Sequence, residues 1–89
     1  MKLDFNFNLL DLDGKELKDA NAGKILANAL IQQTKGDSVK IWELALSLNK
    51  GEIVDLDSSD QELVKTFIRD TETLNIVAKG QLLPLFNKG

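Results

Sequence analysis

The side chains that could do chemistry in this 89-residue chain are carboxylates, hydroxyls and ammonium groups, because it has no His, no Cys and no Tyr. Without His it lacks the commonest general base and the commonest metal ligand. Without Cys it has no thiol nucleophile, no thiolate metal site and no disulfide. Any catalysis would have to use carboxylates, and any metal would have to be bound through oxygen ligands.

One acidic segment has part of the pattern of a calcium loop. Asp55, Asp57 and Ser59 occupy its first, third and fifth positions, which supply oxygen ligands. However, Asp60 stands where that loop has glycine, and Thr66 stands where it has a bidentate glutamate. Helix capping explains the acids better, since an anion at a helix N-terminus stabilises it by about 0.3–1 kcal/mol. We therefore expect no metal site and no cofactor.

Two further patterns fall short of a catalytic or nucleotide site. Asp57 and Glu62 could form a pair of carboxylates, but the sequence indicates no apolar pocket that would shift a pKa for acid–base work. Gly23 and Lys24 match the end of a phosphate-binding loop, yet the earlier glycine and the following Ser or Thr of that loop are both missing. The sequence therefore predicts no enzymatic activity.

Composition limits the fold and the partners. With 43% hydrophobic and 28% charged residues, the chain has the composition of one globular domain spanning residues 1–89. Eleven basic and 14 acidic side chains give a net charge of −3, so nucleic acid is not expected as the main partner. The apolar runs are too short for a signal peptide or a membrane span. A cysteine-free domain of this size favours a reducing compartment, and we expect a cytoplasmic protein.

The N-terminal part has the alternation of a β-hairpin. Every second residue in segment 2–10 is apolar, which predicts a half-buried strand. The apolar positions are Leu3, Phe5, Phe7 and Leu9. Asp13-Gly14 supplies a turn, and segment 15–18 can return as the second strand. Segment 52–56 is either a third short strand or an extended link.

Helical spacing dominates the remaining residues. The expected helices cover about 21–34, 38–50, 60–70 and 71–84, the last ending near Pro84. The expected N-caps are Asp19 or Asn21, Asp37, Ser59 in a capping box with Glu62, and Thr71. The fold class is therefore α+β, with an N-terminal β-hairpin packed on three or four helices. In the first helix, Gly23 and Ala27 should let another backbone approach closely.

The second helix is apolar over more than half of its circumference, so we expect it to be central and packed on several sides. Trp42, the sole Trp, is then a core residue, with an anchor for a partner as the alternative. The first two helices could also form a helix-turn-helix motif. A plain αα-hairpin is favoured, because Trp42 and its neighbouring leucines are needed for the core.

The fourth helix carries two apolar faces. Ile76 and Leu83 lie seven residues apart, nearly opposite the core stripe, with Gly80 between them. A monomer of this size has difficulty covering both faces, and each side chain left exposed forfeits roughly 1.5–3 kcal/mol of burial. We therefore predict that Ile76, Gly80 and Leu83 line a contact with another protein. The alternatives are that the hairpin covers this face, or that its exposed residues have no role.

Several segments resemble small, uncharacterised proteins encoded by bacteriophages and prophages. They are Leu3-Asp4-Phe5-Asn6-Phe7, Leu12-Asp13-Gly14, Ala22-Gly23-Lys24-Ile25-Leu26-Ala27-Asn28, Lys35-Gly36-Asp37, Glu72-Thr73-Leu74 and Val77-Ala78-Lys79. The resemblance covers most of the chain and implies a phage context, including virion or tail assembly, without bringing catalytic residues. The expected function is a non-enzymatic, self-associating protein-interaction module, or one with a hetero-partner. The alternative is a small regulator that binds a nucleic-acid-binding protein or DNA.

Overall fold

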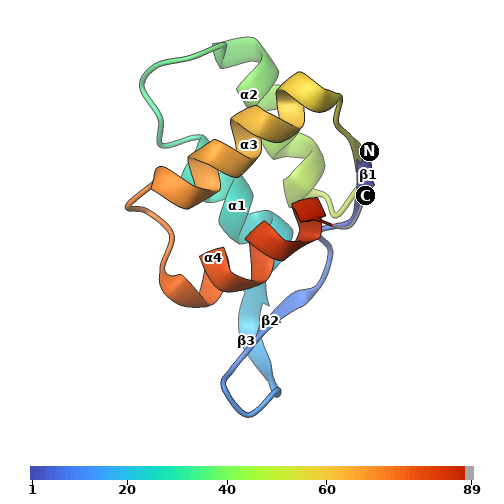
Figure 1. Cartoon of the computed structure of the whole chain (residues 1–89), viewed down its shortest axis with the longest axis vertical. Coiled ribbons are helices and arrows are strands. Elements are labelled where there is room, and N and C mark those ends of the chain that lie inside the picture. The colour runs from blue at the N-terminus through green and yellow to red at the C-terminus, as the bar shows by residue number, and fades with distance from the viewer. Residues whose placement is uncertain (88–89) are drawn as a thin grey trace.

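The computed structural model describes residues 1–87 (Figure 1). In chain order its elements are β1 (Lys2–Leu3), β2 (Asn8–Leu10), β3 (Glu16–Asn21), α1 (Ala22–Leu30), α2 (Ser38–Asn49), β4 (Val54–Asp55), α3 (Ser58–Asp70), α4 (Ile76–Leu82) and the 3₁₀ helix η1 (Leu83–Asn87). Two small antiparallel sheets pair β1 with β4 and β2 with β3. The predicted α+β class is confirmed.

The predicted hairpin forms between β2 and β3. Its turn is fixed at Asp11, whose amide donates to the Lys15 carbonyl at 2.8 Å and whose carbonyl accepts from the Gly14 amide at 3.1 Å. Gly14 has a φ of 82°, a left-handed conformation that glycine adopts without steric cost. β3 then continues beyond the predicted segment 15–18 and leads directly into α1.

The single strand predicted over 2–10 is wrong, because it divides into β1 and β2. The carbonyls of Phe5 and Phe7 turn toward α1 and accept hydrogen bonds from the amides of Gly23 and Ala22, at 2.9 and 2.8 Å. These amides are among the donors that a helix N-terminus leaves unpaired. The segment between the strands therefore caps α1 instead of extending a sheet. β1 pairs with β4, so the third strand expected near 52–56 exists but joins a different sheet from the hairpin.

The first two helices begin where the sequence predicts. Asn21 and Asp37 are their N-caps, and their side chains accept from the amides of Lys24 and Lys40. α1 ends at Leu30, four residues short of its expected end. Beyond it, the side-chain amides of Gln32 and Gln33 donate to the carbonyls of Asn28 and Leu30 in the last turn of α1.

Two predicted caps are wrong. Asp57, not Ser59, caps α3, because its carboxylate accepts from the Asp60 amide at 2.7 Å and starts the helix two residues earlier. Thr71 ends α3 instead of capping α4, and its hydroxyl accepts from the Thr73 amide in the connecting loop. Asn75 caps α4 by accepting from the Ala78 amide.

The core collects apolar side chains from the helices, β1, β2 and β4. Within residues 1–87 no polar or charged residue is buried, and the largest fully buried side chains include Phe5, Leu26, Leu30, Leu48 and Leu82. Phe5 also stacks at a tilt on Phe86, with ring centroids 6.2 Å apart. No helix within the described residues has the length and apolar character needed to cross a membrane.

Candidate functional site

Large apolar side chains are exposed in three hollowed places among residues 1–87. The first lies between α4 and the hairpin, the second lies on α1 and α2 around Trp42, and the third is a groove between α2 and α3. A contiguous exposed apolar surface of this kind is a common marker of a binding site.

The α4–hairpin surface consists of Leu10, Leu12, Ile76, Val77 and Gly80 around a hollow of about 280 Å³. Leu12 stands at the hairpin tip with its side chain fully exposed, and Ile76 is 81% exposed. Figure 1 shows why the two elements meet, because the hairpin projects from the helical body beside α4. The surface is thus formed by segments that lie more than 60 residues apart in the sequence.

Gln81 fixes these two elements to each other. Its Oε1 accepts from the Leu10 amide and its Nε2 donates to the Leu10 carbonyl, both at 2.8 Å. The carboxamide thereby occupies the edge of β2 that faces away from β3. This reciprocal pair holds the hairpin at a defined position on α4, so the apolar surface is preorganised.

The α4–hairpin surface is almost uncharged. Asp11 is the one ionisable residue lining its hollow among those the structure describes, and its Oδ1 accepts from the amides of Asp13 and Lys15 at 2.9 and 3.0 Å. Gly80 leaves further room, since a Cβ at this position would have no atom within 4 Å. A large apolar side chain of another molecule can therefore approach the helix backbone closely here.

The structure brings together two of the three residues nominated from the sequence. Ile76 and Gly80 line the same hollow, whereas Leu83 starts η1 and is half-buried against the core. The hairpin adjoins this face of α4, but it leaves Ile76 open. Sequence reasoning missed Leu10 and Leu12, although a leucine between two aspartates in a turn is itself a signal of exposure.

The Trp42 surface corrects the expectation of a central second helix. Trp42 is 54% exposed, and it lies beside Val39, Leu46 and Ile31, which are also exposed. Only Ile41, Ala45 and Leu48 of α2 are buried, so this helix packs on one side. The alternative role of Trp42, as an anchor for a partner, is compatible with this position.

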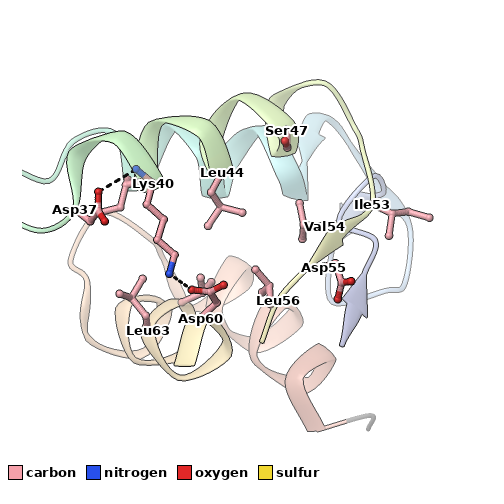
Figure 2. A pocket seen from close by; sticks show the side chains of 12 residues that line it. Asp37, Lys40, Leu44, Ser47, Ile53, Val54, Asp55, Leu56, Asp60 and Leu63 are labelled. Atoms are coloured by element: carbon pink, nitrogen blue, oxygen red, sulfur yellow. Dashed lines mark hydrogen bonds and ion pairs between the residues drawn. The ribbon is translucent and has the colours of Figure 1, made fainter. Parts of the chain in front are cut away.

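The α2–α3 groove has a volume of about 270 Å³ (Figure 2). Its walls are α2, α3 and β4, and Leu44 and Leu56 point into the space between the helices. Buried core residues such as Val64 form its floor, while Leu63 and Ile53 are exposed at its rim, at 46% and 63%. The groove is therefore apolar inside and open to solvent.

Charged side chains border this groove. Lys40 reaches from α2 across the gap and forms an ion pair with Oδ1 of Asp60 on α3. The hydrogen bond to Asp60 and the negative charge of that carboxylate raise the pKa of Lys40, with smaller contributions from Asp57 and Asp37. Asp37 and Asp55 also line the groove, so carboxylates outnumber ammonium groups around it.

The residues of the calcium-like segment have other partners. Asp57 caps α3, Asp60 pairs with Lys40, and Asp55 lies 3.4 Å from the N-terminal ammonium group. Among residues 1–87, no three carboxylates converge as metal ligands.

Comparisons with protein-family models, curated proteins and solved structures find no match to this chain. Its function must therefore be inferred from its own surfaces.

Proposed function

We propose that this protein is a non-enzymatic interaction module that self-associates through the α4–hairpin surface. The observation that carries the proposal is the hollow lined by Leu10, Leu12, Ile76, Val77 and Gly80, which is apolar, nearly uncharged and held rigid by Gln81. Preorganisation lowers the entropic cost of association, since neither element has to be ordered on binding.

The shape of this surface suits a two-fold contact between copies. In such a contact the same patch is used by both molecules, and a protrusion of one meets a hollow of the other. Leu12 is the protrusion and the open space above Gly80 is the hollow. Two reciprocal insertions would each bury a leucine side chain, with a gain of roughly 1.5–3 kcal/mol apiece.

Electrostatics favour this surface for self-contact over the more charged parts of the molecule. Each copy carries a net charge of −3, so two copies repel each other at long range. A nearly neutral contact area avoids placing like charges opposite one another. Shape, rather than charge, then gives specificity. Added salt should strengthen the association, because it screens the repulsion between the two molecules.

The cellular setting is part of the same proposal. The segments that resemble phage and prophage proteins support a role in phage assembly, where a self-associating module would join larger particles. The lack of cysteine supports action in the reducing cytoplasm of the host. A structural role of this kind requires a stable contact surface and no catalytic group.

Sedimentation equilibrium over a range of protein concentrations tests the proposal. We expect the wild-type chain to be dimeric at the upper concentrations, and the variants Leu12→Asp and Ile76→Glu to stay monomeric. The matched control is Leu63→Asp, which places the same charge on an exposed leucine of α3. Circular dichroism and urea unfolding check that each variant is folded.

The emission of Trp42 separates the proposed surface from the neighbouring one. If copies meet through α4 and the hairpin, the indole stays exposed and its emission maximum does not change with concentration. A wild-type chain that remains monomeric, or a dimer that survives both Leu12→Asp and Ile76→Glu, would contradict the proposal. A blue shift of Trp42 on association would assign the contact to the Trp42 surface instead.

A further inference from the structure

We infer that the α2–α3 groove is a second binding site, which takes a segment of a different protein carrying large apolar side chains flanked by Lys or Arg. This inference does not depend on self-association, since it uses other elements and other residues. It follows from the size of the groove, the exposed apolar rim and the sign of the surrounding charge.

The groove offers apolar anchoring positions for a helix or peptide of another protein. Its volume of about 270 Å³ lies just below the roughly 300 Å³ at which small-molecule sites begin. It runs between two helices and exposes Leu63 and Ile53 at its edges, with Leu44 pointing into it (Figure 2). An amphipathic helix lays its apolar face into such a groove, using residues spaced three and four apart as anchors.

The charge around the groove selects a basic partner. Its lining within the described part of the chain includes Asp37, Asp55 and Asp60 but only one cation, Lys40, which is already paired with Asp60. Asp37 and Asp55 are exposed, and Asp55 also lies 3.4 Å from the N-terminal ammonium group, so the charge around the groove stays net negative after both ion pairs are counted. Complementary charge of this kind speeds association and excludes acidic competitors.

A second copy of this chain fits the groove poorly. The part that projects furthest from the helical body is the hairpin, at the bottom of Figure 1. Between residues 11 and 19 it carries four acidic and two basic side chains. Inserting it would bring net negative charge toward a groove that is itself net negative. The charges therefore favour a hetero-partner over self-association at this site.

Selection from a random peptide library tests the inference, because it does not require the natural partner to be identified first. The library would display peptides of about 16 residues, long enough for roughly four helical turns, and would be selected against the full chain. We expect the enriched peptides to carry Lys or Arg beside apolar residues at helical spacing. In ¹⁵N-correlated spectra, the best peptide should shift the amides of α2, β4 and α3.

Variants then assign the binding to the groove. Leu63→Ser, which removes an apolar anchor without adding a charge that would attract a basic peptide, should weaken the binding of the selected peptide by at least about tenfold. Lys40→Gln removes the one cation that lines the groove among the described residues and should strengthen binding. Leu12→Ser is the matched control, because it makes the same substitution on the α4–hairpin surface and should leave peptide binding unchanged.

Three results would overturn the inference. The selection could yield no peptide that binds the purified chain, or it could yield peptides without an excess of basic residues. The amide shifts could also fall on the hairpin or around Trp42 rather than on α2 and α3. Because substitutions at Leu12 and Leu63 act on separate surfaces, self-association and peptide binding can fail independently.

Discussion

The side chain of Gln81 on α4 is bonded to both backbone groups of Leu10 on β2, accepting from its amide and donating to its carbonyl at 2.8 Å. The exposed edge of a strand is normally a place where another strand can add. Here the carboxamide of Gln81 already binds the backbone amide and carbonyl of Leu10, so these groups are not free to pair with another strand. Any association through the α4–hairpin surface should therefore proceed by side-chain packing and not by extension of the sheet.

Replacing Gln81 by Ala should destabilise the protein by about 1–3 kcal/mol, because two hydrogen bonds worth roughly 0.5–1.5 kcal/mol each are lost. Urea unfolding measures the free energy, and amide exchange at Leu10 should accelerate. The matched control is Gln32→Ala, which removes one exposed bond to the Asn28 carbonyl. Equal losses of stability in the two variants would show that the paired hydrogen bonds of Gln81 to Leu10 contribute no more than a single exposed bond.

The substitution Gly80→Ala should stabilise the fold and at the same time weaken self-association. Because no atom lies within 4 Å of the added Cβ, alanine should stabilise α4 by about 0.5–1 kcal/mol. The same methyl group would fill the hollow that we assign to Leu12 of a second copy, so the dimer should weaken. Thermal unfolding and sedimentation measure the two effects. A variant that is more stable and equally dimeric would show that Gly80 is not at the contact.

In contrast to Gly80→Ala, the substitution Gly23→Ala on α1 should lower the free energy of unfolding. A Cβ there would lie 2.6 Å from the Leu48 carbonyl oxygen, which belongs to the backbone of α2 and cannot rotate away. The added methyl group would push α1 and α2 apart, and overpacking of this kind typically lowers the free energy of unfolding by about 1–3 kcal/mol. Urea unfolding of Gly23→Ala should show this loss. Stability equal to the wild type would mean that the two helices are not in such close contact.

The start of α3 should depend on Asp57 and not on Ser59. Asp57→Ala removes the carboxylate that accepts from the Asp60 amide and should cost about 0.5–2 kcal/mol. Ser59→Ala lies inside the first turn and should change stability by less than about 0.5 kcal/mol. Chemical denaturation of the two variants compares them directly. A larger loss for Ser59→Ala would restore the capping box predicted from the sequence.

From neutral pH upward, the Lys40–Asp60 ion pair should contribute to stability until the pH becomes strongly alkaline. The hydrogen bond to Asp60 raises the pKa of Lys40 above the ordinary value of 10.5 in the folded protein. Its contribution is thus complete from neutral pH up to about pH 10.5 and declines as the pH rises through the raised pKa of Lys40.

We therefore expect the difference in urea midpoint between wild type and Lys40→Met to be constant in neutral buffer and to shrink above pH 10.5. Lys24→Met, which removes an exposed ammonium group on α1, is the control for general charge effects. A difference that grows with alkaline pH would have the wrong sign for this ion pair.

Local patterns in the sequence are sufficient for much of the fold. Asn21 and Asp37 are N-caps as predicted, since such caps depend on residues only three positions away. The close approach expected at Gly23 is also confirmed, against the Leu48 carbonyl oxygen. These features depend on spacing and residue size, which can be read directly along the chain.

Features that depend on distant partners could not be predicted. The division of the first strand depends on carbonyls of Phe5 and Phe7 that meet the start of α1, and alternation of apolar residues carries no sign of this. The exposure of Trp42 depends on which side of α2 receives neighbours. At the candidate site, helical spacing placed Ile76 and Gly80 together, but only the tertiary fold adds Leu12 from the hairpin.

The most direct test of the proposed contact is an isotope-filtered nuclear Overhauser experiment on a mixture of ¹³C-labelled and unlabelled protein, at a concentration where the dimer is populated. We predict intermolecular signals from the Leu12 methyl groups of one copy to Gly80 and Ile76 of the other. A dimer without these signals, with cross-peaks from the Trp42 ring in their place, would contradict self-association through α4 and the hairpin.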